Sequence, residues 1–256
     1  MRHKRPQRAK PGKNAPSPRP DQQVIYGGHA VVAALKNPRR KILKISATEN
    51  AAHRFNDALK SFGKKLNIVK ALELDRMLEA EAVHQGLVLH TRPLPEPNLE
   101  QILAAGQKRL LLVVLDQITD PHNVGAILRS CAAFGVSAIL LPARNSVEFS
   151  GTLAKAASGA LEHVPLVRVA NLARALKTLK QAHVSVVGFD SELSDDFEKL
   201  NDLKRIALVF GAEGKGMRRL TRENCDHLVA LKISGPIKSL NVSNACAVAL
   251  YAASRQ

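Results

Sequence analysis

Apolar and polar positions alternate in blocks along residues 108–256, in the order expected of strands that alternate with helices. Short, continuously apolar runs predict buried strands at about 110–116, 137–142, 164–169, 184–190, 206–211 and 228–233. Segments with helical spacing lie at about 124–134, 150–159, 171–182, 217–223 and 240–254. This alternation is typical of a mostly parallel sheet with helices on both faces, so we expect an α/β fold.

The last predicted strand and helix enclose a polar turn. HLVALKI (227–233) is followed by SGPIKSLNVSN (234–244), and ACAVALYAAS (245–254) is then apolar on almost every side. We expect such a helix to be buried both against its own sheet and against a second surface. Ser239 stands where a helix N-cap is expected, and Asn241 follows in the predicted first turn.

Three of the predicted strands end in loops rich in Gly, Pro and polar residues. LLLVVLD (110–116) is followed by QITDPHNVGA, IALVFG (206–211) is followed by AEGKGM, and the final strand is followed by the polar turn. Loops at the carboxyl ends of parallel strands form the ligand sites of open α/β sheets. We therefore expect one site that contains Asn123, Arg129, Glu213, Ser239 and Asn241.

The remainder of the chain divides into a tail, a small unit and a linker. Residues 1–21 hold seven Lys or Arg and five Pro, so we expect a disordered basic tail that tethers RNA non-specifically. In residues 22–92 the pattern predicts a small α/β unit, with helices near 28–37 and 52–63 and strands near 41–48, 66–69 and 84–91. We expect this unit to bind a ligand and not to carry out chemistry. Three Pro within five residues mark residues 93–107 as a linker to the domain 108–256.

The net charge and the cysteines indicate the class of ligand and the cellular compartment. A net charge of +16 predicts binding to a polyanion, which for a soluble protein usually means nucleic acid. The sequence contains neither a membrane-length apolar run nor a secretory signal. Its three cysteines, Cys131, Cys225 and Cys246, have no metal-binding spacing, so we expect a cytoplasmic protein without disulfides or a metal.

Several common sites are excluded by the motifs that are missing. The sequence has no GxGxxG after a strand, no GxxxxGK[ST] and no GxSxG, which argues against a dinucleotide fold, a phosphate-binding P-loop and a serine hydrolase. Aromatic residues make up 4% of the chain and Trp is absent, which argues against an aromatic platform for single-stranded nucleic acid.

Three segments resemble the motifs of a known family. DPHNVGAILRS (120–130), VFGAEGKGM (209–217) and SLNVSNA (239–245) are similar to the three motifs of the SpoU/TrmH family of RNA ribose 2′-O-methyltransferases. IYGGHAVVAAL (25–35) and AVHQGLVL (82–89) resemble the L30e-like RNA substrate-binding domain of one branch. That branch contains bacterial enzymes that methylate a guanosine in the peptidyl-transferase region of 23S ribosomal RNA.

The resemblance implies a cofactor, a topology and an assembly. It implies S-adenosylmethionine as methyl donor, a C-terminal trefoil knot, and a homodimer with the cofactor near the subunit interface. The cofactor would lie against Gly211, Leu231, Ile233 and Leu240. The family usually has Ile-Pro-Met where this chain has Leu231, Lys232 and Ile233, a change that removes a proline and adds a positive charge.

The same resemblance suggests roles for the candidate catalytic residues. Arg129 is expected to be essential, either as the base that removes the hydroxyl proton or as a clamp on a flanking phosphate. Asn123 would orient the hydroxyl or Arg129, and Glu213 would pair with a cation or orient its loop. Ser239 and Asn241 would hydrogen-bond the substrate or the cofactor loop.

Two other functions fit the same features. The chain would carry out the same chemistry on transfer RNA, or it would bind RNA without catalysis. Binding of the cofactor would distinguish an enzyme from an RNA-binding protein without catalysis. The identity of the methylated RNA would distinguish a transfer RNA enzyme from a ribosomal RNA enzyme.

Overall fold

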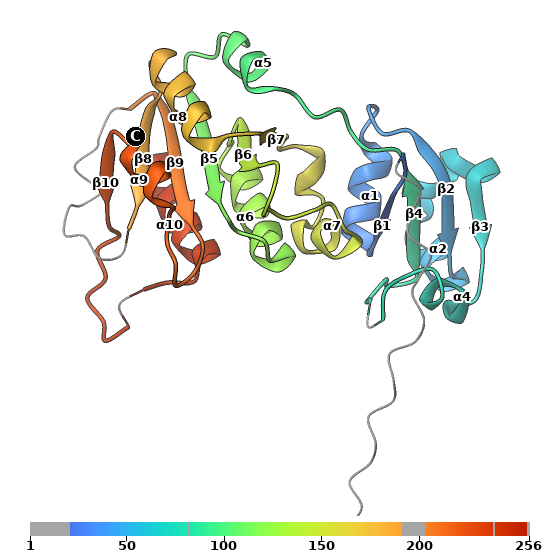
Figure 1. The fold of residues 1–256 in the computed structure, drawn as a ribbon. Coiled ribbons are helices and arrows are strands. Elements are labelled where there is room, and N and C mark those ends of the chain that lie inside the picture. Colours follow the sequence, from blue (N-terminus) through green and yellow to red (C-terminus); the bar gives the residue numbers. More distant parts are fainter. Residues whose placement is uncertain (1–20, 81, 191–202, 238, 255–256) are drawn as a thin grey trace, which may run out of the picture. The chain divides into compact units, whose positions relative to one another are not determined.

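The computed structural model describes residues 21–80, 82–190, 203–237 and 239–254. The described residues form two compact units, which divide between Pro93 and Leu94 (Figure 1). The predicted disordered tail lies outside the described residues, apart from Asp21. Among the described helices, none has both the length and the apolar character that crossing a membrane requires.

The second unit is built on a six-stranded sheet with the order β10-β8-β9-β5-β6-β7. Every pair of neighbouring strands in it is parallel, which confirms the predicted parallel sheet. The strands are β5 (Leu110–Asp116), β6 (Ala138–Pro142), β7 (Leu166–Val169), β8 (Ser185–Phe189), β9 (Arg205–Gly211) and β10 (His227–Val229). The helices are α5 (Leu99–Ala104), α6 (Pro121–Ala133), α7 (Gly151–Ala157), η2 (Ala160–Glu162), α8 (Leu172–Gln181), α9 (Arg219–Glu223) and α10 (Val242–Ser254).

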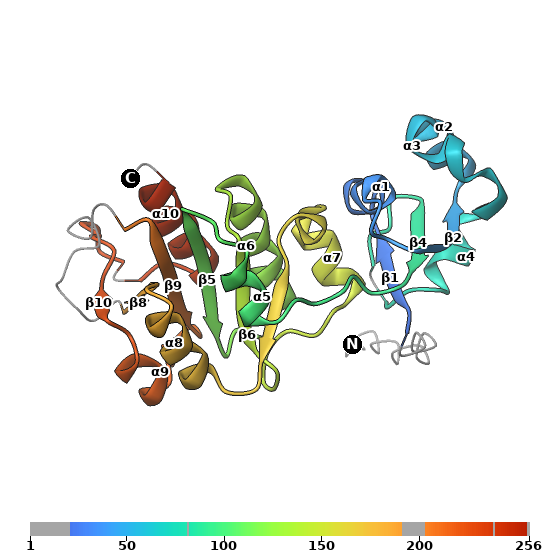
Figure 2. The ribbon, with the colours of Figure 1, turned by 90° about the horizontal axis from the view of Figure 1, so that it is seen from above.

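Both faces of this sheet are buried. Successive side chains of a strand point to opposite faces, so each strand contributes to two separate cores. In β5, Leu111 and Val113 join a core with side chains of α6, α7 and α10. Leu110 and Leu112 join a second core, which contains side chains of α5 and α8. The predicted helix layers on both faces are therefore present, and Figure 2 shows α6 and α10 on the side of the sheet opposite α8.

The last strand and the start of the last helix differ from the predictions. The sequence predicts a strand at 228–233, but β10 ends at Val229. It is an edge strand that pairs only with β8 among the described strands. The helix starts at Val242, so the predicted N-cap role of Ser239 is wrong. Asn241 takes this position instead, and its Oδ1 accepts a hydrogen bond from the Ser243 backbone N–H at 2.9 Å.

Helix α10 buries one side in the chain that carries it. Cys246, Ala249 and Leu250 are fully buried in the core beside α6. On the other side, Val248 is 48% exposed and Tyr251 is 52% exposed. The expectation of burial on both sides is therefore met on one side only within a single chain.

The first unit contains a four-stranded mixed sheet with the order β1-β4-β2-β3. Strand β4 pairs antiparallel with β1 and β2, while β2 and β3 are parallel. The strands are β1 (Gln23–Tyr26), β2 (Ile42–Ala47), β3 (Leu66–Ile68) and β4 (Leu87–Thr91), and the helices are α1 (Gly28–Lys36), α2 (Glu49–Arg54), α3 (Asn56–Leu59), η1 (Lys60–Lys65) and α4 (Ala71–Asp75).

One predicted helix of this unit is broken into three pieces. Residues 52–63 were expected to form a single helix, but α2, α3 and η1 follow one another there. The backbone leaves helical geometry at Phe55 (φ −110°, ψ 22°) and again at Phe62 (φ −111°, ψ 19°). The spacing of apolar residues does not predict such breaks, because the contacts that stabilise a broken helix are made with segments distant in sequence.

The cysteine thiols are expected to react slowly in the folded protein. Cys131 and Cys246 are fully buried where α6 packs on α10, and all three cysteines are free. Hydrogen bonding with the Cys246 thiol and burial raise the pKa of Cys131, and burial raises the pKa of Cys225 to about 12. Because the thiolate is the reactive form, Ellman's reagent at pH 8 should modify these thiols only after denaturant is added. A thiol titrated quickly in the native protein would contradict this.

Candidate functional site

The loops after β5 and β9 leave the sheet at the same edge. The two strands are neighbours, and Asp116 at the end of β5 pairs in register with Gly211 at the end of β9. Helix α6 begins shortly after β5, where the Asp120 Oδ1 accepts a hydrogen bond from the His122 backbone N–H at 2.9 Å. Asn123 therefore lies in the first turn of a capped helix, beside the loop that follows β9.

Glu213 joins three segments that are distant in sequence. Its Oε1 accepts hydrogen bonds from Asn241 Nδ2 at 2.5 Å, Asn123 Nδ2 at 3.3 Å and the Val242 backbone N–H at 3.3 Å. Asn241 Nδ2 also donates to Asn123 Oδ1 at 3.0 Å. We call these three residues, Asn123, Glu213 and Asn241, the carboxamide cluster. The Glu213 carboxylate lies at the N-terminus of α10, where the helix dipole stabilises a negative charge.

The loop that carries Glu213 is shaped by glycines. Ala212 and Gly216 exchange backbone hydrogen bonds of 3.1 and 2.8 Å, so the chain turns back on itself directly after β9. Gly214 and Gly216 have φ values of +74° and +65°, a region that favours glycine. A Cβ atom on Gly211 would lie 2.1 Å from the Gly216 carbonyl carbon, so the close approach of the two backbones requires glycine at 211.

Sequence reasoning missed the residue that fixes the far end of this loop. The Asp116 side chain has no exposed surface, and its Oδ1 accepts a hydrogen bond from Arg218 Nε at 2.7 Å. Its Oδ2 accepts another from the Arg218 backbone N–H at 2.9 Å. A carboxylate at the end of an otherwise apolar strand was the available signal, because a buried charge requires a partner.

We expect Asp116→Asn to loosen the loop between Gly211 and Arg218. Loss of charge-assisted hydrogen bonds from a buried carboxylate should lower the free energy of unfolding by about 1.5–3 kcal/mol. Urea denaturation measures this loss. The control is Glu223→Gln, which removes the exposed Arg219–Glu223 ion pair (2.6 Å) and should cost less than about 1 kcal/mol. Equal losses in the two variants would contradict a special role for Asp116.

Two of the predicted catalytic residues lie outside the carboxamide cluster. Arg129 is six residues further along α6 than Asn123, which places it about 120° around the helix axis. Its side chain is exposed and makes no hydrogen bond or ion pair with a described residue. Ser239 is exposed in the turn before α10 and likewise has no partner within the described ranges. Glu213 was expected to pair with a cation such as Arg129 or to orient its loop. It does not pair with Arg129, since its Oε1 accepts hydrogen bonds from Asn123, Asn241 and Val242 instead.

The predicted cofactor residues outside β9 lie in the segment between β10 and α10. Leu231 is partly buried against the core, whereas Ile233 and Leu240 are 38% and 40% exposed. Backbone groups of residues 231–237 and 239–240 form no hydrogen bonds with other described residues. Exposed apolar side chains beside backbone donors and acceptors that have no partner among the described residues suit a ligand with both an apolar body and a polar edge.

Each of the two units matches the model of a known protein family. Residues 110–251 match the model of the SpoU rRNA Methylase family. Residues 24–97 match the model described as RNA 2′-O ribose methyltransferase substrate binding. No group of three or more His, Cys, Asp or Glu that suits a metal ion occurs in the part of the chain that the structure describes.

Individual relatives agree with these matches. The chain is 42% identical over 242 residues to the 23S rRNA (guanosine-2′-O-)-methyltransferase RlmB of Vibrio cholerae, covering 91% of this chain and 97% of the relative. It is 38% identical over 241 residues to RlmB of Escherichia coli K12, covering 91% and 98%.

A solved structure has the same fold. The SpoU methyltransferase AviRb from Streptomyces viridochromogenes, in complex with the cofactor AdoMet, superposes with a TM-score of 0.78 at 20% identity. The superposition covers 92% of this chain and 90% of AviRb. Together with the two family matches, this confirms the resemblance found in the three sequence motifs: the chain belongs to the SpoU family of RNA 2′-O-ribose methyltransferases.

Proposed function

We propose that the chain transfers a methyl group to the ribose 2′-hydroxyl of a guanosine in 23S ribosomal RNA, with S-adenosylmethionine as donor. The observation that supports this most strongly is the carboxamide cluster, which joins one residue from each of the three family motifs. Relatives with this activity in their names align over 91% of the chain at about 40% identity. The protein's net charge of +16 suits an RNA substrate.

The residues around the turn before α10 fit the cofactor. Ile233 and Leu240 would contact its apolar parts, and the backbone groups of residues 231–237, which have no hydrogen-bond partner within the described ranges, would bind the adenine edge. Gly211 would let the loop after β9 approach closely. When bound, S-adenosylmethionine supplies a methyl group on a sulfonium sulfur, which becomes a neutral thioether when the ribose oxygen takes the methyl.

The chain must then hold the ribose and accept its proton. The 2′-oxygen forms a bond to the methyl carbon, the carbon–sulfur bond breaks, and the hydroxyl proton passes to a base. Holding the hydroxyl in line with the methyl group supplies the larger part of the rate, and proton removal typically adds ~10²–10⁴-fold. We assign orientation of the hydroxyl to Asn123 and Asn241, and contact with RNA to Ser239. Arg129 acts as the base or clamps the flanking phosphate.

The active unit in this proposal is a homodimer. The outer side of α10, with Val248 and Tyr251, provides an apolar surface for a second copy. Arg129 lies on the exposed side of α6 and would join the carboxamide cluster of the partner. Sedimentation velocity should give twice the mass of the chain. A mixture of the Arg129→Ala and Glu213→Ala variants should regain activity, because one site in a heterodimer would be intact.

We also propose that residues 205–254 contain the trefoil knot expected from the family. Strand β10 lies at one edge of the sheet beyond β8, whereas α10 packs against α6 beside β9. The chain therefore crosses the ends of β8 and β9 between these two elements. A backbone traced by crystallography should give a trefoil, not an unknotted chain, when its ends are joined.

The domain roles follow from the same proposal. Residues 22–92 would bind the RNA substrate, residues 93–107 would connect them to the methyltransferase domain 108–256, and residues 1–21 would tether RNA. A ribosomal RNA substrate would place the protein in the bacterial cytoplasm.

The deciding experiment maps 2′-O-methyl groups in total RNA from cells with and without the protein. Loss of one guanosine mark in 23S ribosomal RNA, in the peptidyl-transferase region, supports the proposal. Loss of a transfer RNA mark would select the transfer RNA enzyme instead. An unchanged map together with no cofactor binding in calorimetry would select an RNA-binding module without catalysis.

A further inference from the structure

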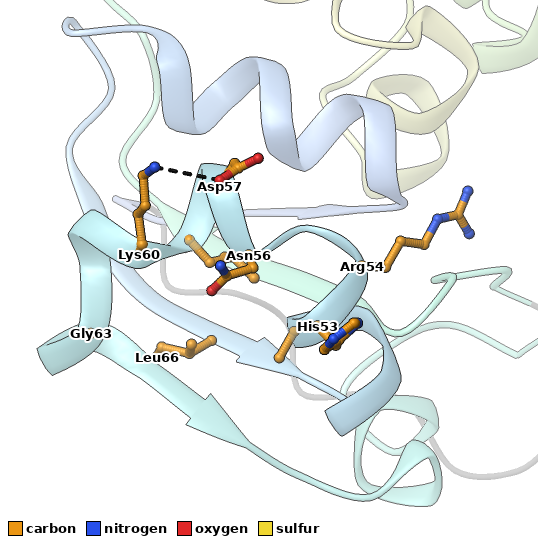
Figure 3. Close-up of a pocket in the computed structure, with 9 residues that line it drawn as sticks. His53, Arg54, Asn56, Asp57, Lys60, Gly63 and Leu66 are labelled. Carbon is orange, nitrogen blue, oxygen red and sulfur yellow. Dashed lines mark hydrogen bonds and ion pairs between the residues drawn. The ribbon is translucent and has the colours of Figure 1, made fainter.

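The first unit contains a pocket of about 650 Å³ beside its broken helix (Figure 3). It lies between α2 and α3 on one side and η1 and β3 on the other. Ala52, Leu59 and Leu66 supply apolar lining, and Leu59 is 2% exposed. The backbone breaks at Phe55 and Phe62 lie within the same segment, residues 52–66, that lines the pocket.

The pocket is also lined by solvent-exposed polar side chains that have no partner among the described residues. His53 and Asn56 line it, and neither side chain forms a hydrogen bond with another described residue. Figure 3 shows Asn56 above Leu66, with His53 beside them. Lys60 is paired with Asp57 at 3.4 Å, but both side chains are largely exposed, so the pair is weak and available for exchange.

The surroundings of the pocket are positively charged. Residues 54–65 contain four basic residues and one acidic residue. The Arg54 guanidinium extends away from the pocket and lies over the Phe55 ring, 5.1 Å from its centroid. Lys64 is exposed next to Gly63, which lines the pocket. An anion linked to the pocket's occupant would therefore meet cations at the rim.

From these features we propose that the pocket binds one unpaired nucleotide of the RNA, at a position other than the methylated guanosine. The base would lie on the apolar lining and hydrogen-bond to His53 and Asn56, and its phosphate would meet Lys64. Bases in a paired A-form helix are not accessible to such a pocket, whereas bases in loops and bulges are. The inference rests on the proposed function for the identity of the RNA, and it adds the position where a second nucleotide is read.

The test uses the full-length double variant His53→Ala/Asn56→Ala and a 23S ribosomal RNA transcript. Loss of the hydrogen bonds from His53 and Asn56 should raise the Kd for this RNA about 5- to 30-fold. KM should rise with it, while kcat at saturating RNA and the cofactor Kd stay unchanged. The matched control is Ser61→Ala, since Ser61 is exposed in the same segment and does not line the pocket. A fully paired RNA duplex should bind wild type and double variant equally.

Chemical probing of the bound transcript gives the second readout. Wild-type protein should protect one unpaired nucleotide away from the methylated guanosine, and the double variant should leave it reactive. The inference is overturned if wild type methylates the transcript while the double variant matches Ser61→Ala in Kd and protection. If wild type protects that nucleotide through His53 and Asn56 but methylates no 23S guanosine, the proposed function fails and the pocket stands. Asn56→Ala alone provides the same comparison if the double variant lacks a cooperative melting transition.

Discussion

Replacing Arg129 with alanine is expected to lower methyl transfer at least about 10³-fold, because both roles considered for it act on the transition state. The fold and the affinity for S-adenosylmethionine should stay near wild type. Arg129 is exposed on α6 and forms no hydrogen bond or ion pair with a described residue, so its removal disrupts no contact that the structure describes. Single-turnover transfer of a labelled methyl group to the 23S transcript measures the loss, and calorimetry measures cofactor binding.

The matched control for this experiment is Arg174→Ala. Arg174 is an exposed arginine on α8, which packs on the opposite face of the sheet. Its removal should leave transfer within about twofold of wild type, as expected of a solvated surface residue. Turnover at the wild-type rate in the Arg129 variant would remove Arg129 from the catalytic residues.

The variant Arg129→Lys separates the two roles of Arg129. In the clamp case the lysine keeps a positive charge near the flanking phosphate, so it should retain part of the activity and mainly raise KM.

The substitution Gly211→Ala is expected to abolish cofactor binding and to destabilise the second unit. The added Cβ would lie 2.1 Å from the Gly216 carbonyl carbon and 2.2 Å from the Met217 backbone N, both of them backbone atoms that cannot turn aside. The loop of residues 212–216 must therefore shift, and Glu213 would lose its hydrogen bonds in the carboxamide cluster. We expect a loss of at least about 2–3 kcal/mol in the free energy of unfolding.

The control for this substitution lies in the first unit. Gly63→Ala adds the same methyl group at a position where no atom lies within 4 Å of the new Cβ. It should leave both the free energy of unfolding and the cofactor Kd near their wild-type values. Calorimetric titration with S-adenosylmethionine compares the two variants. Cofactor binding by Gly211→Ala with wild-type affinity would show that the loop approaches β9 less closely than described.

The fold of the second unit followed from its sequence to a large extent. Strands buried on both faces are continuously apolar, as in LLLVVLD, and this signal is strong because each side chain must avoid water. Breaks caused by tertiary contacts gave no such signal. Residues 52–63 have helical spacing, yet the chain bends at Phe55, whose ring lies so close to Gly28 that a Cβ there would contact it at 2.5 Å.

The candidate site was predicted as a set of residues, but their contacts were not. The rule that loops at the carboxyl ends of parallel strands form sites was enough to group Asn123, Glu213 and Asn241. That Glu213 binds the two amides depends on the turn between Ala212 and Gly216 and on the position of α10. The partner of Asp116 is Arg218, which lies 102 residues away, and no local pattern encodes a pairing over that distance.

The sequence by itself determined the element types, the parallel α/β class, the family and the residues that its motifs contribute. The element types and the fold class depend on the hydrophobic period, which is readable from neighbouring positions, whereas the family came from the resemblance of three short segments to known motifs. Only the tertiary structure decided that Asn241 and not Ser239 caps α10, that Asp116 anchors the β9 loop, and that one side of α10 stays exposed in a single chain. Each of these depends on how segments far apart in the sequence pack together, because hydrogen bonds and burial are settled by neighbours in space.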